Sequence, residues 1–558
     1  MPIVLILIAI SLFLSFRTIT GMLLPIISVL VSTVWTIGIM SILNIPLTII
    51  TNCIPVILIA IGSAYNVHII NKFYEEASTG NDAAKSSQFA LSTIGTPVIL
   101  SAVTTAAGFI AFIFGSYLSM IRDFGIFSSI GVLFALITSI TFVPSILSVL
   151  PQKIKKARIA TSDAPKITVD RFMESIGRLI LKNEKLIFII LIVAIVASII
   201  AIPEIGRKVN MLDYFEEGNI VRITEEIMEE KFGGSIPIQI LVKGDIQNPA
   251  LLKEMKKMGD FLESMGNIHN AQSVADLIEE MSDVMDEGKT IPDSKAKVVN
   301  LWFLIEGEEI MSQLVNSNKT EAVIQATMTD INTERIQELV IKVNNYIKKI
   351  DTSVGSFSQT GIPSIYQHLD DSIMSSQVQS LILAIILVFI CITLLLNSIY
   401  GGLIGLAPIG VTLVFIFGFM GYSSIPLDIV TVLIGSISLG IGIDYSIHFI
   451  SRFKNEFSKS SSKEDALFMT LRTSGKAIII NVATVTAGFI VFVLATLVPT
   501  QRFGVLISLT MIAAGFCSIT LLPSIILLSK ARFVGNWDEL AGRVSNNIKN
   551  KISDVGKK

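Results

Sequence analysis

Charged residues are scarce in this sequence. Only 16% of its 558 residues are Asp, Glu, Lys or Arg, whereas 51% are hydrophobic and the mean hydropathy is +0.70. A soluble protein of this size normally carries about a quarter charged residues. The apolar residues also gather in long blocks, which is typical of membrane-spanning helices and excludes an ordinary soluble globular protein.

Cysteine and histidine are also rare, at three and four residues. Cys53, Cys391 and Cys517 all fall in apolar blocks, which argues against a disulfide framework or a cysteine-based metal site. The sequence contains no Walker loop, no metal-ligand cluster and no serine or cysteine nucleophile near a suitable base. We therefore expect no enzymatic activity, no cofactor and no metal.

Ten apolar stretches are long enough to cross a membrane, which takes about 20 residues each. They lie near 22–43, 47–70, 95–116, 124–150 and 185–203, and then near 377–396, 401–421, 427–450, 475–497 and 503–529. The shorter stretch from Met1 to Phe16 lacks the basic leading region and cleavage site of a signal peptide, so we interpret it as an eleventh membrane helix.

The few charges are unevenly distributed. Between Glu204 and Ser372 there are 29 acidic and 16 basic residues, a balance of −13, and the rest of the chain carries +11. Basic residues concentrate in 151–184, in 451–476 and after Ser529, and such loops favour the cytoplasmic side. This pattern predicts a cytoplasmic-membrane protein with 204–372 outside and the C-terminus inside, and it argues against a nucleic-acid partner.

The sequence thus predicts a polytopic α-helical membrane protein with one α+β, ferredoxin-like extracytoplasmic domain. Its expected parts are a first membrane block (1–150), a basic cytoplasmic linker (151–184), a membrane helix (185–203), the extracytoplasmic domain (204–372), a second membrane block (373–529) and a basic cytoplasmic tail (530–558). In the extracytoplasmic domain, strands at 237–243 and 321–328 and helices at 250–265 and 333–350 fit the ferredoxin-like order, interrupted by an acidic helix at 274–286.

The two membrane blocks are an internal repeat. Tyr65 and His68 realign with Tyr445 and His448 at an offset of 380 residues, and Ile45-Pro46-Leu47 realigns with Ile425-Pro426-Leu427 at the same offset. Because His, Tyr and Pro keep their register in several helices, we interpret the repeat as a duplicated five-helix block. The first half has no counterpart of 204–372 or of the helix before it. A sequence fragment, a late start site and gene decay are the explanations we consider.

Asp444 is the most informative residue because it lies midway along an apolar span. An ionised carboxylate costs about 3 kcal/mol there, so we expect desolvation to let Asp444 take up and release a proton near neutral pH. His448 shares its helical face, and Tyr445 lies on the adjoining one. The first half has Ala64 at the equivalent position but keeps Tyr65 and His68.

These residues predict a proton relay with a surrounding shell. The relay is Asp444, Tyr445, Tyr65, His448 and His68, with Thr104, Thr105, Asn481, Thr484 and Thr486 as supporting donors and Gly440, Gly442, Gly62, Gly108 and Gly488 for close helix packing. The alternatives are that Asp444 is a static hydrogen-bonding residue, that the histidines face lipid headgroups and that the threonines only pack.

The segments 440–449 and 62–68 resemble the resistance-nodulation-cell division superfamily, and more closely its MMPL-like, hydrophobe/amphiphile efflux-3 branch. The blocks 22–150 and 400–529 resemble the sterol-sensing-domain unit of this superfamily. The resemblance implies an exporter of hydrophobic or amphiphilic compounds, lipids included, driven by the proton gradient. It also implies two facing Asp-Tyr pairs. Asp444 and Tyr445 match one pair, but Ala64 before Tyr65 removes one acid from the other.

The alternatives to export are a non-transporting, lipid-sensing scaffold and an accessory to protein export. Expected partners are membrane lipids and a hydrophobic or amphiphilic substrate. A second copy of the chain or an envelope protein is a further candidate partner.

Overall fold

The computed structural model describes residues 2–78, 80–149, 168–206, 211–329, 333–458 and 462–528. The chain divides into two compact units. The helical unit consists of Met1–Gly206, Ile373–Ala495 and Pro499–Lys558, and the sheet unit consists of Arg207–Ser372 with Thr496–Val498. The expected tail 530–558 and most of the expected linker, 151–167, lie outside the described residues.

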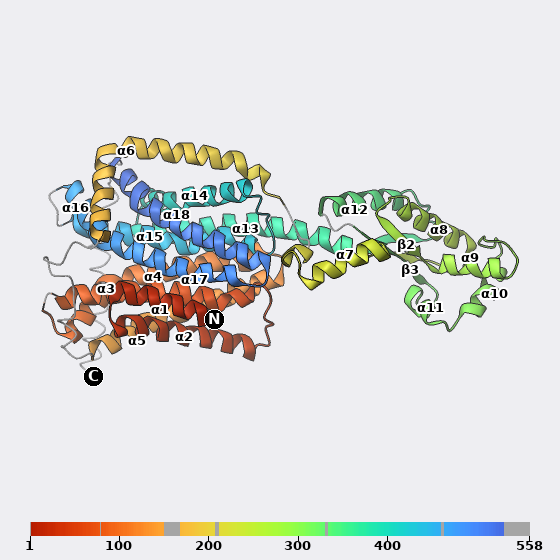
Figure 1. Ribbon diagram of the computed structural model, residues 1–558, viewed down its shortest axis with the longest axis horizontal. Helices are drawn as coiled ribbons and strands as arrows, with labels where there is room; N and C mark the ends of the chain where they lie inside the picture. The colour runs from red at the N-terminus through yellow and green to blue at the C-terminus, as the bar shows by residue number, and fades with distance from the viewer. Residues whose placement is uncertain are drawn as a thin grey trace. The chain divides into compact units, whose positions relative to one another are not determined.

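The helical unit contains the membrane helices of both halves (Figure 1). The first half supplies α1 (Pro2–Phe16), α2 (Ile19–Ile42), α3 (Ile54–Ser78), α4 (Ala83–Gly115), α5 (Ser119–Ser148) and α6 (Thr168–Ala201). The second half supplies α13 (Ile362–Leu396), α14 (Ile399–Tyr422), α15 (Ile434–Phe457), α16 (Lys463–Thr470), α17 (Lys476–Phe489) and α18 (Val498–Leu528).

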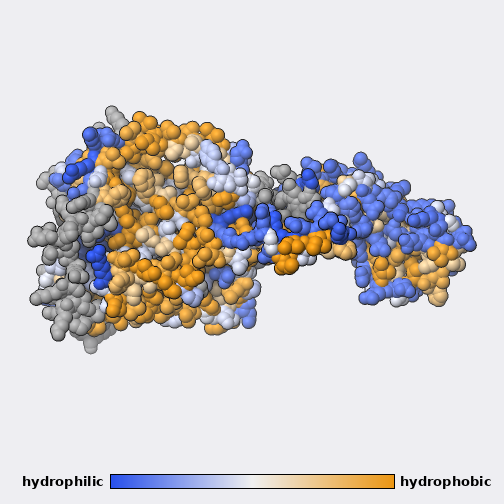
Figure 2. All heavy atoms as spheres, viewed as in Figure 1, coloured by the Kyte–Doolittle hydropathy of each residue, from blue (hydrophilic) through white to orange (hydrophobic). Residues whose placement is uncertain are grey.

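Ten helices in the described part of the chain are long and apolar enough to cross a membrane, and α1 is a shorter apolar helix. Figure 2 shows hydrophobic residues over most of the visible flank of the helical unit. Large apolar side chains of the membrane helices such as Trp35 and Val193 are 47% and 62% exposed, as expected for contact with lipid. The prediction of a polytopic helical membrane protein is confirmed.

Helix α6 changes direction before it enters its apolar span. Its backbone leaves helical geometry at Asn183, and the candidate span begins at Leu186. The preceding segment belongs to the expected basic linker but is helical, because Met173, Ile176 and Ile180 form a buried apolar stripe at helical spacing.

The repeat is visible in the local structure of both halves. Thr51 and Thr431 each accept a hydrogen bond of 2.7 Å from a backbone N–H three residues earlier, and each donates to a proline carbonyl, Pro46 or Pro426. Positive φ angles also recur at this offset, for example 54° at Asn44 and 51° at Ser424. These matched turns confirm the predicted duplication.

Helices α3 and α15 form the centre of the helical unit, since their apolar windows are entirely buried. Each is also contacted by a helix of the other half, because α4 packs on α15 and α17 packs on α3. Gly108 on α4 permits the first crossing: a Cβ atom there would lie 2.9 Å from the Gly440 Cα. In the equivalent second crossing Gly488 faces Ala60, with a Cβ position 3.2 Å from the Ala60 Cβ.

Two further predicted glycines occupy equivalent places within each half. A Cβ atom at Gly62 would lie 2.7 Å from Val29, and one at Gly442 would lie 2.4 Å from Ile409. All five predicted glycines therefore lie where a neighbouring helix comes close. Small residues permit such approach in membranes, where packing rather than hydrophobic burial holds helices together.

The sheet unit contains a four-stranded antiparallel sheet of order β2-β3-β1-β4. Its elements are α7 (Ile220–Phe232), β1 (Ile236–Lys243), α8 (Pro249–Glu263), β2 (Ile268–Gln272), α9 (Val274–Val284), α10 (Lys295–Ile305), α11 (Glu309–Leu314), β3 (Glu321–Met328), α12 (Thr333–Ile347) and β4 (Ser356–Gly361). Alternate residues of β1 and β3 are buried in one core with apolar residues of α8 and α12. The predicted ferredoxin-like order is confirmed, with α9–α11 inserted between β2 and β3.

Candidate functional site

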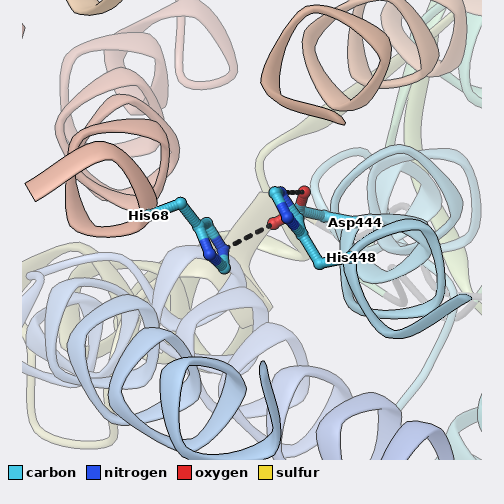
Figure 3. A group of neighbouring side chains, drawn as sticks. All are labelled: His68, Asp444 and His448. Carbon is cyan, nitrogen blue, oxygen red and sulfur yellow. Dashed lines mark ion pairs between the residues drawn. The ribbon is translucent and has the colours of Figure 1, made fainter. Parts of the chain in front are cut away.

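Asp444 lies beside two neighbouring histidines in the interior of the helical unit (Figure 3). Its Oδ1 lies 3.2 Å from the Nε2 of His448, one turn along α15, and its Oδ2 lies 3.8 Å from the Nε2 of His68 on α3. The two imidazole rings stack, with centroids 3.7 Å apart and planes 8° from parallel. The site is therefore built by both halves of the chain.

All three side chains are buried, with 4 to 5% of each residue exposed. The interpretation of the histidines as residues that face lipid headgroups is therefore wrong. A buried carboxylate is stable only when it is paired or protonated, and here two bases lie within ion-pair distance. Two adjacent protonated imidazoles would repel each other, so the geometry favours a proton shared among the three side chains.

Asn481 completes the contacts of the carboxylate. Its Nδ2 donates to Asp444 Oδ2 at 3.2 Å and lies 3.5 Å from His68 Nε2. Ser101 on α4, which the sequence reasoning missed, lies beside the carboxylate as well. Ser101 is the repeat partner of Asn481, so the offset of 380 residues could have identified it.

The two predicted tyrosines are buried but differ in orientation. The Tyr65 hydroxyl borders the hydroxyls of Thr105 and Ser101, although the geometry is not that of a hydrogen bond. The Tyr445 hydroxyl instead donates to the Met511 sulfur on α18, at 3.9 Å. Tyr65 thus borders the site, whereas the Tyr445 hydroxyl is directed to its own half.

The predicted supporting threonines differ in their hydrogen-bond partners. Thr105 donates across the crossing of α4 and α15 to the Gly440 carbonyl oxygen, at 2.8 Å. Thr104 and Thr484 donate to carbonyl oxygens of their own helices, and Thr484 also contacts Ser11 of α1 at 2.9 Å. The Thr486 hydroxyl has no hydrogen-bond partner among the described residues. The structure therefore brings Thr105 and Asn481 to the centre, whereas Thr484 contacts α1 and Thr104 bonds only within its own helix.

A second charged layer lies about one turn from the histidines. Lys72 is 6% exposed and pairs with Glu75 at 2.8 Å and Glu76 at 2.9 Å. Its repeat partner Arg452 pairs with Glu456 at 2.9 Å and reaches the same Glu75 at 3.8 Å. The sequence reasoning missed this layer, although the equivalent basic residues at 72 and 452 are visible in the repeat.

A cleft of about 580 Å³, counting the open space at its mouth, connects the two layers. His68 and His448 line it, together with Lys72, Glu75 and Arg452. The site is thus open toward the end of the helices that carries the basic segment 451–476. The sequence predicts a loop there, but α15 and α16 make most of this segment helical.

The histidines and Asp444 also offer suitable atoms for a divalent transition metal. One ligand atom of each lies within 4.8 Å of the others, and two imidazoles with a carboxylate suit zinc. However, the nitrogen lone pairs of two parallel, stacked rings lie in separate parallel planes. A single ion in line with both lone pairs would therefore require one ring to rotate out of the stack.

The family model that matches this chain is that of the MMPL family, over residues 1–200 and 244–550. A membrane protein of Methanocaldococcus jannaschii is 26% identical over 372 residues, which are 64% of this chain and 93% of that protein. The apo-petrobactin exporter of Bacillus anthracis is 25% identical over 264 residues, 44% of this chain and 35% of the exporter.

The hedgehog release protein Disp of the water bear Hypsibius dujardini has a similar solved structure. The TM-score is 0.66 at 13% sequence identity, over 94% of this chain and 69% of that protein. At this identity the likeness establishes the fold alone.

Proposed function

Since the chain belongs to the MMPL family, with nearly its whole length matched, we propose that it exports hydrophobic or amphiphilic compounds, lipids included, and is driven by the proton gradient. Family membership and the likeness to an exporter support a membrane transporter of the resistance-nodulation-cell division kind. The finer proposal rests on the site. It involves no cofactor and no enzymatic step.

The observation that carries the proposal is the position of Asp444. A single buried carboxylate contacts one histidine of each half, at 3.2 Å and 3.8 Å. A proton that enters or leaves the site changes its net charge, and within the site it needs to move only between neighbouring oxygen and nitrogen atoms. Each change alters the attraction between α3 and α15, which belong to different halves.

The donor set favours a proton over sodium as the coupling ion. Hard cations are held by several oxygen ligands. Two of the three ionisable side chains at this site are imidazoles, which offer nitrogen and not oxygen ligands. Asn481 directs its Nδ2 donor to the carboxylate of the third, Asp444. Neutral imidazole is a base with a proton affinity suited to neutral pH.

Movement of the membrane helices has a covalent route to the sheet unit. Helix α13 begins at Ile362, directly after β4 ends at Gly361, so no loop separates the sheet from the helix. We propose that protonation of Asp444 repacks the two halves and that α13 transmits this to the sheet unit, which lies on the outer side of the cytoplasmic membrane. Lipids contact the helical unit, and nucleic acid plays no part.

The test is Asp444→Asn in proteoliposomes, with Nile red as a lipophilic probe and an imposed pH gradient. We expect gradient-driven movement of the dye to be lost while the protein still folds, with Asp293→Asn on the exposed sheet unit as the matched control. Normal dye movement by Asp444→Asn would refute the proposal.

A lipid-sensing scaffold without transport is the second candidate. Ala64 favours it, because a second central carboxylate is missing where the family pattern has one. Absence of gradient-driven movement in the unmodified protein, together with saturable lipid binding, would support this candidate instead.

A further inference from the structure

The cleft beside the histidines lies on the symmetry axis of the repeat. Each residue that lines it has its repeat partner in the lining too. The pairs include His68 with His448, Asn71 with Ser451, and Lys72 with Arg452. A cavity formed by accidental packing has no reason to follow the repeat in this way.

Two layers along this axis share one feature, a pair of equivalent basic residues that contact the same carboxylate. In the deeper layer, the equivalent bases His68 and His448 share one carboxylate, Asp444. In the outer layer, the equivalent cations Lys72 and Arg452 share one carboxylate, Glu75. The second half supplies Asp444, opposite Ala64, and the first half supplies Glu75, opposite Asn455. In each layer, the carboxylate that both basic groups share has no repeat partner; the outer layer also contains the equivalent pair Glu76 and Glu456.

We infer that this cleft is an aqueous vestibule through which the site exchanges its proton with the basic-loop side of the membrane, and that Glu75 is the carboxylate at its mouth. This inference rests on the proposed function. The proton leaves the Asp444 carboxyl as an N–H bond forms on His448 or His68. The imidazolium then releases it to water in the cleft, where Glu75 accepts it.

Two cations flank the mouth of the cleft. Lys72 and Arg452 each pair with a glutamate of their own helix, Glu76 or Glu456, besides the shared Glu75. The Glu75 carboxylate lies 2.8 Å from the Lys72 ammonium and 3.8 Å from the Arg452 guanidinium, which places one negative group between the two cations at the mouth of the cleft.

Accessibility to a membrane-impermeant thiol reagent tests the vestibule without any substrate. The background is a protein in which Cys53, Cys391 and Cys517 are replaced by Ser. Asn71→Cys or Ser451→Cys is introduced into it, and sealed vesicles are treated with a methanethiosulfonate reagent that carries a trimethylammonium group. Both thiols should react in inside-out vesicles and stay unreactive in right-side-out vesicles. Ser353→Cys, exposed on the sheet unit, should show the opposite sidedness, and Ser436→Cys, 1% exposed, should react in neither.

Failure of both cleft thiols to react, or reaction from the outer side, overturns the vestibule. It leaves the proposed function standing if Asp444→Asn still abolishes gradient-driven dye movement, so the two failures are distinguishable.

The role of Glu75 can be tested by moving its carboxylate to Asn455, the equivalent position of the second half. Glu75→Asn should slow proton exchange, followed with an internal pH dye, by about tenfold or more. Adding Asn455→Glu should restore a large part of the rate, because it returns one carboxylate to the equivalent position in the cleft. A double variant as slow as Glu75→Asn, in a protein that still labels at Asn71→Cys, would show that Glu75 accepts no proton.

Discussion

The imidazole rings of His68 and His448 stack at a centroid distance of 3.7 Å, although they stand at equivalent positions in the two halves of the chain. The stack lies on the repeat axis and brings both Nε2 atoms to the one central carboxylate. A duplicated protein that keeps one acid can therefore still use basic groups from both of its halves.

The shared carboxylate makes the two histidines interdependent. We expect His68→Gln and His448→Gln each to slow gradient-driven transport, with the larger loss for His448, whose Nε2 lies closer to Asp444. The double variant should lose less than the product of the two single losses, because both act through Asp444. Rates of proton exchange in proteoliposomes measure this. Fully multiplicative losses would argue for two independent proton paths.

An aspartate at the equivalent position of the first half should replace Asp444 in part. Asp444→Ala should abolish proton coupling, and the addition of Ala64→Asp should restore part of it, since position 64 stands to His68 as Asp444 stands to His448. Restoration should be partial because Asn481, which donates to Asp444, corresponds to Ser101 in the first half, so the new aspartate would have a different neighbour. Proton exchange in the single and double variants checks this, and an inactive but folded double variant would contradict it.

The crossing of α4 and α15 tolerates no added side chain. Gly108→Val should destabilise the protein by about 1–3 kcal/mol, because even a Cβ atom there would lie 2.9 Å from the Gly440 Cα. Gly38→Val on α2 is the matched control, since a Cβ atom at Gly38 has no neighbour within 4 Å. Thermal unfolding in detergent should show a lower midpoint for Gly108→Val alone, and equal midpoints would contradict the prediction.

Thr105 and Thr104 are adjacent in sequence, but Thr105 donates a hydrogen bond to another helix whereas Thr104 donates within its own. Thr105→Val removes the hydrogen bond to the Gly440 carbonyl of the other half and should cost about 0.6 kcal/mol, typical of such bonds in membranes. Thr104→Val removes only bonds within α4 and should cost less. Chemical denaturation of the two variants makes the comparison. A larger loss for Thr104→Val would contradict the assigned contacts.

Several features of the fold could be predicted because they depend on local pattern. The strand 321–328 was located to the residue, since alternation of buried and exposed side chains is visible in the sequence. The helical segment of the expected linker was missed, because its stripe of Met173, Ile176 and Ile180 is short and lies among many charges.

The candidate site could be predicted in part. Asp444 and His448 lie one turn apart on one helix, so their contact follows from helix geometry. The side-chain orientations could not be predicted, and the Tyr445 hydroxyl contacts Met511 although Tyr445 is adjacent to the key acid. Rotamers depend on neighbouring helices, and one sequence does not define those.

The sequence alone determined that this protein is a duplicated, multi-pass membrane protein with one exceptional acid, because hydropathy, charge and repeated motifs are properties of the chain itself. Only the tertiary structure decided that His68 shares this acid, that Glu75 bridges the two cations and that the cleft follows the repeat axis. These contacts join helices hundreds of residues apart, so they depend on how α3 and α15 are brought together by α4 and α17.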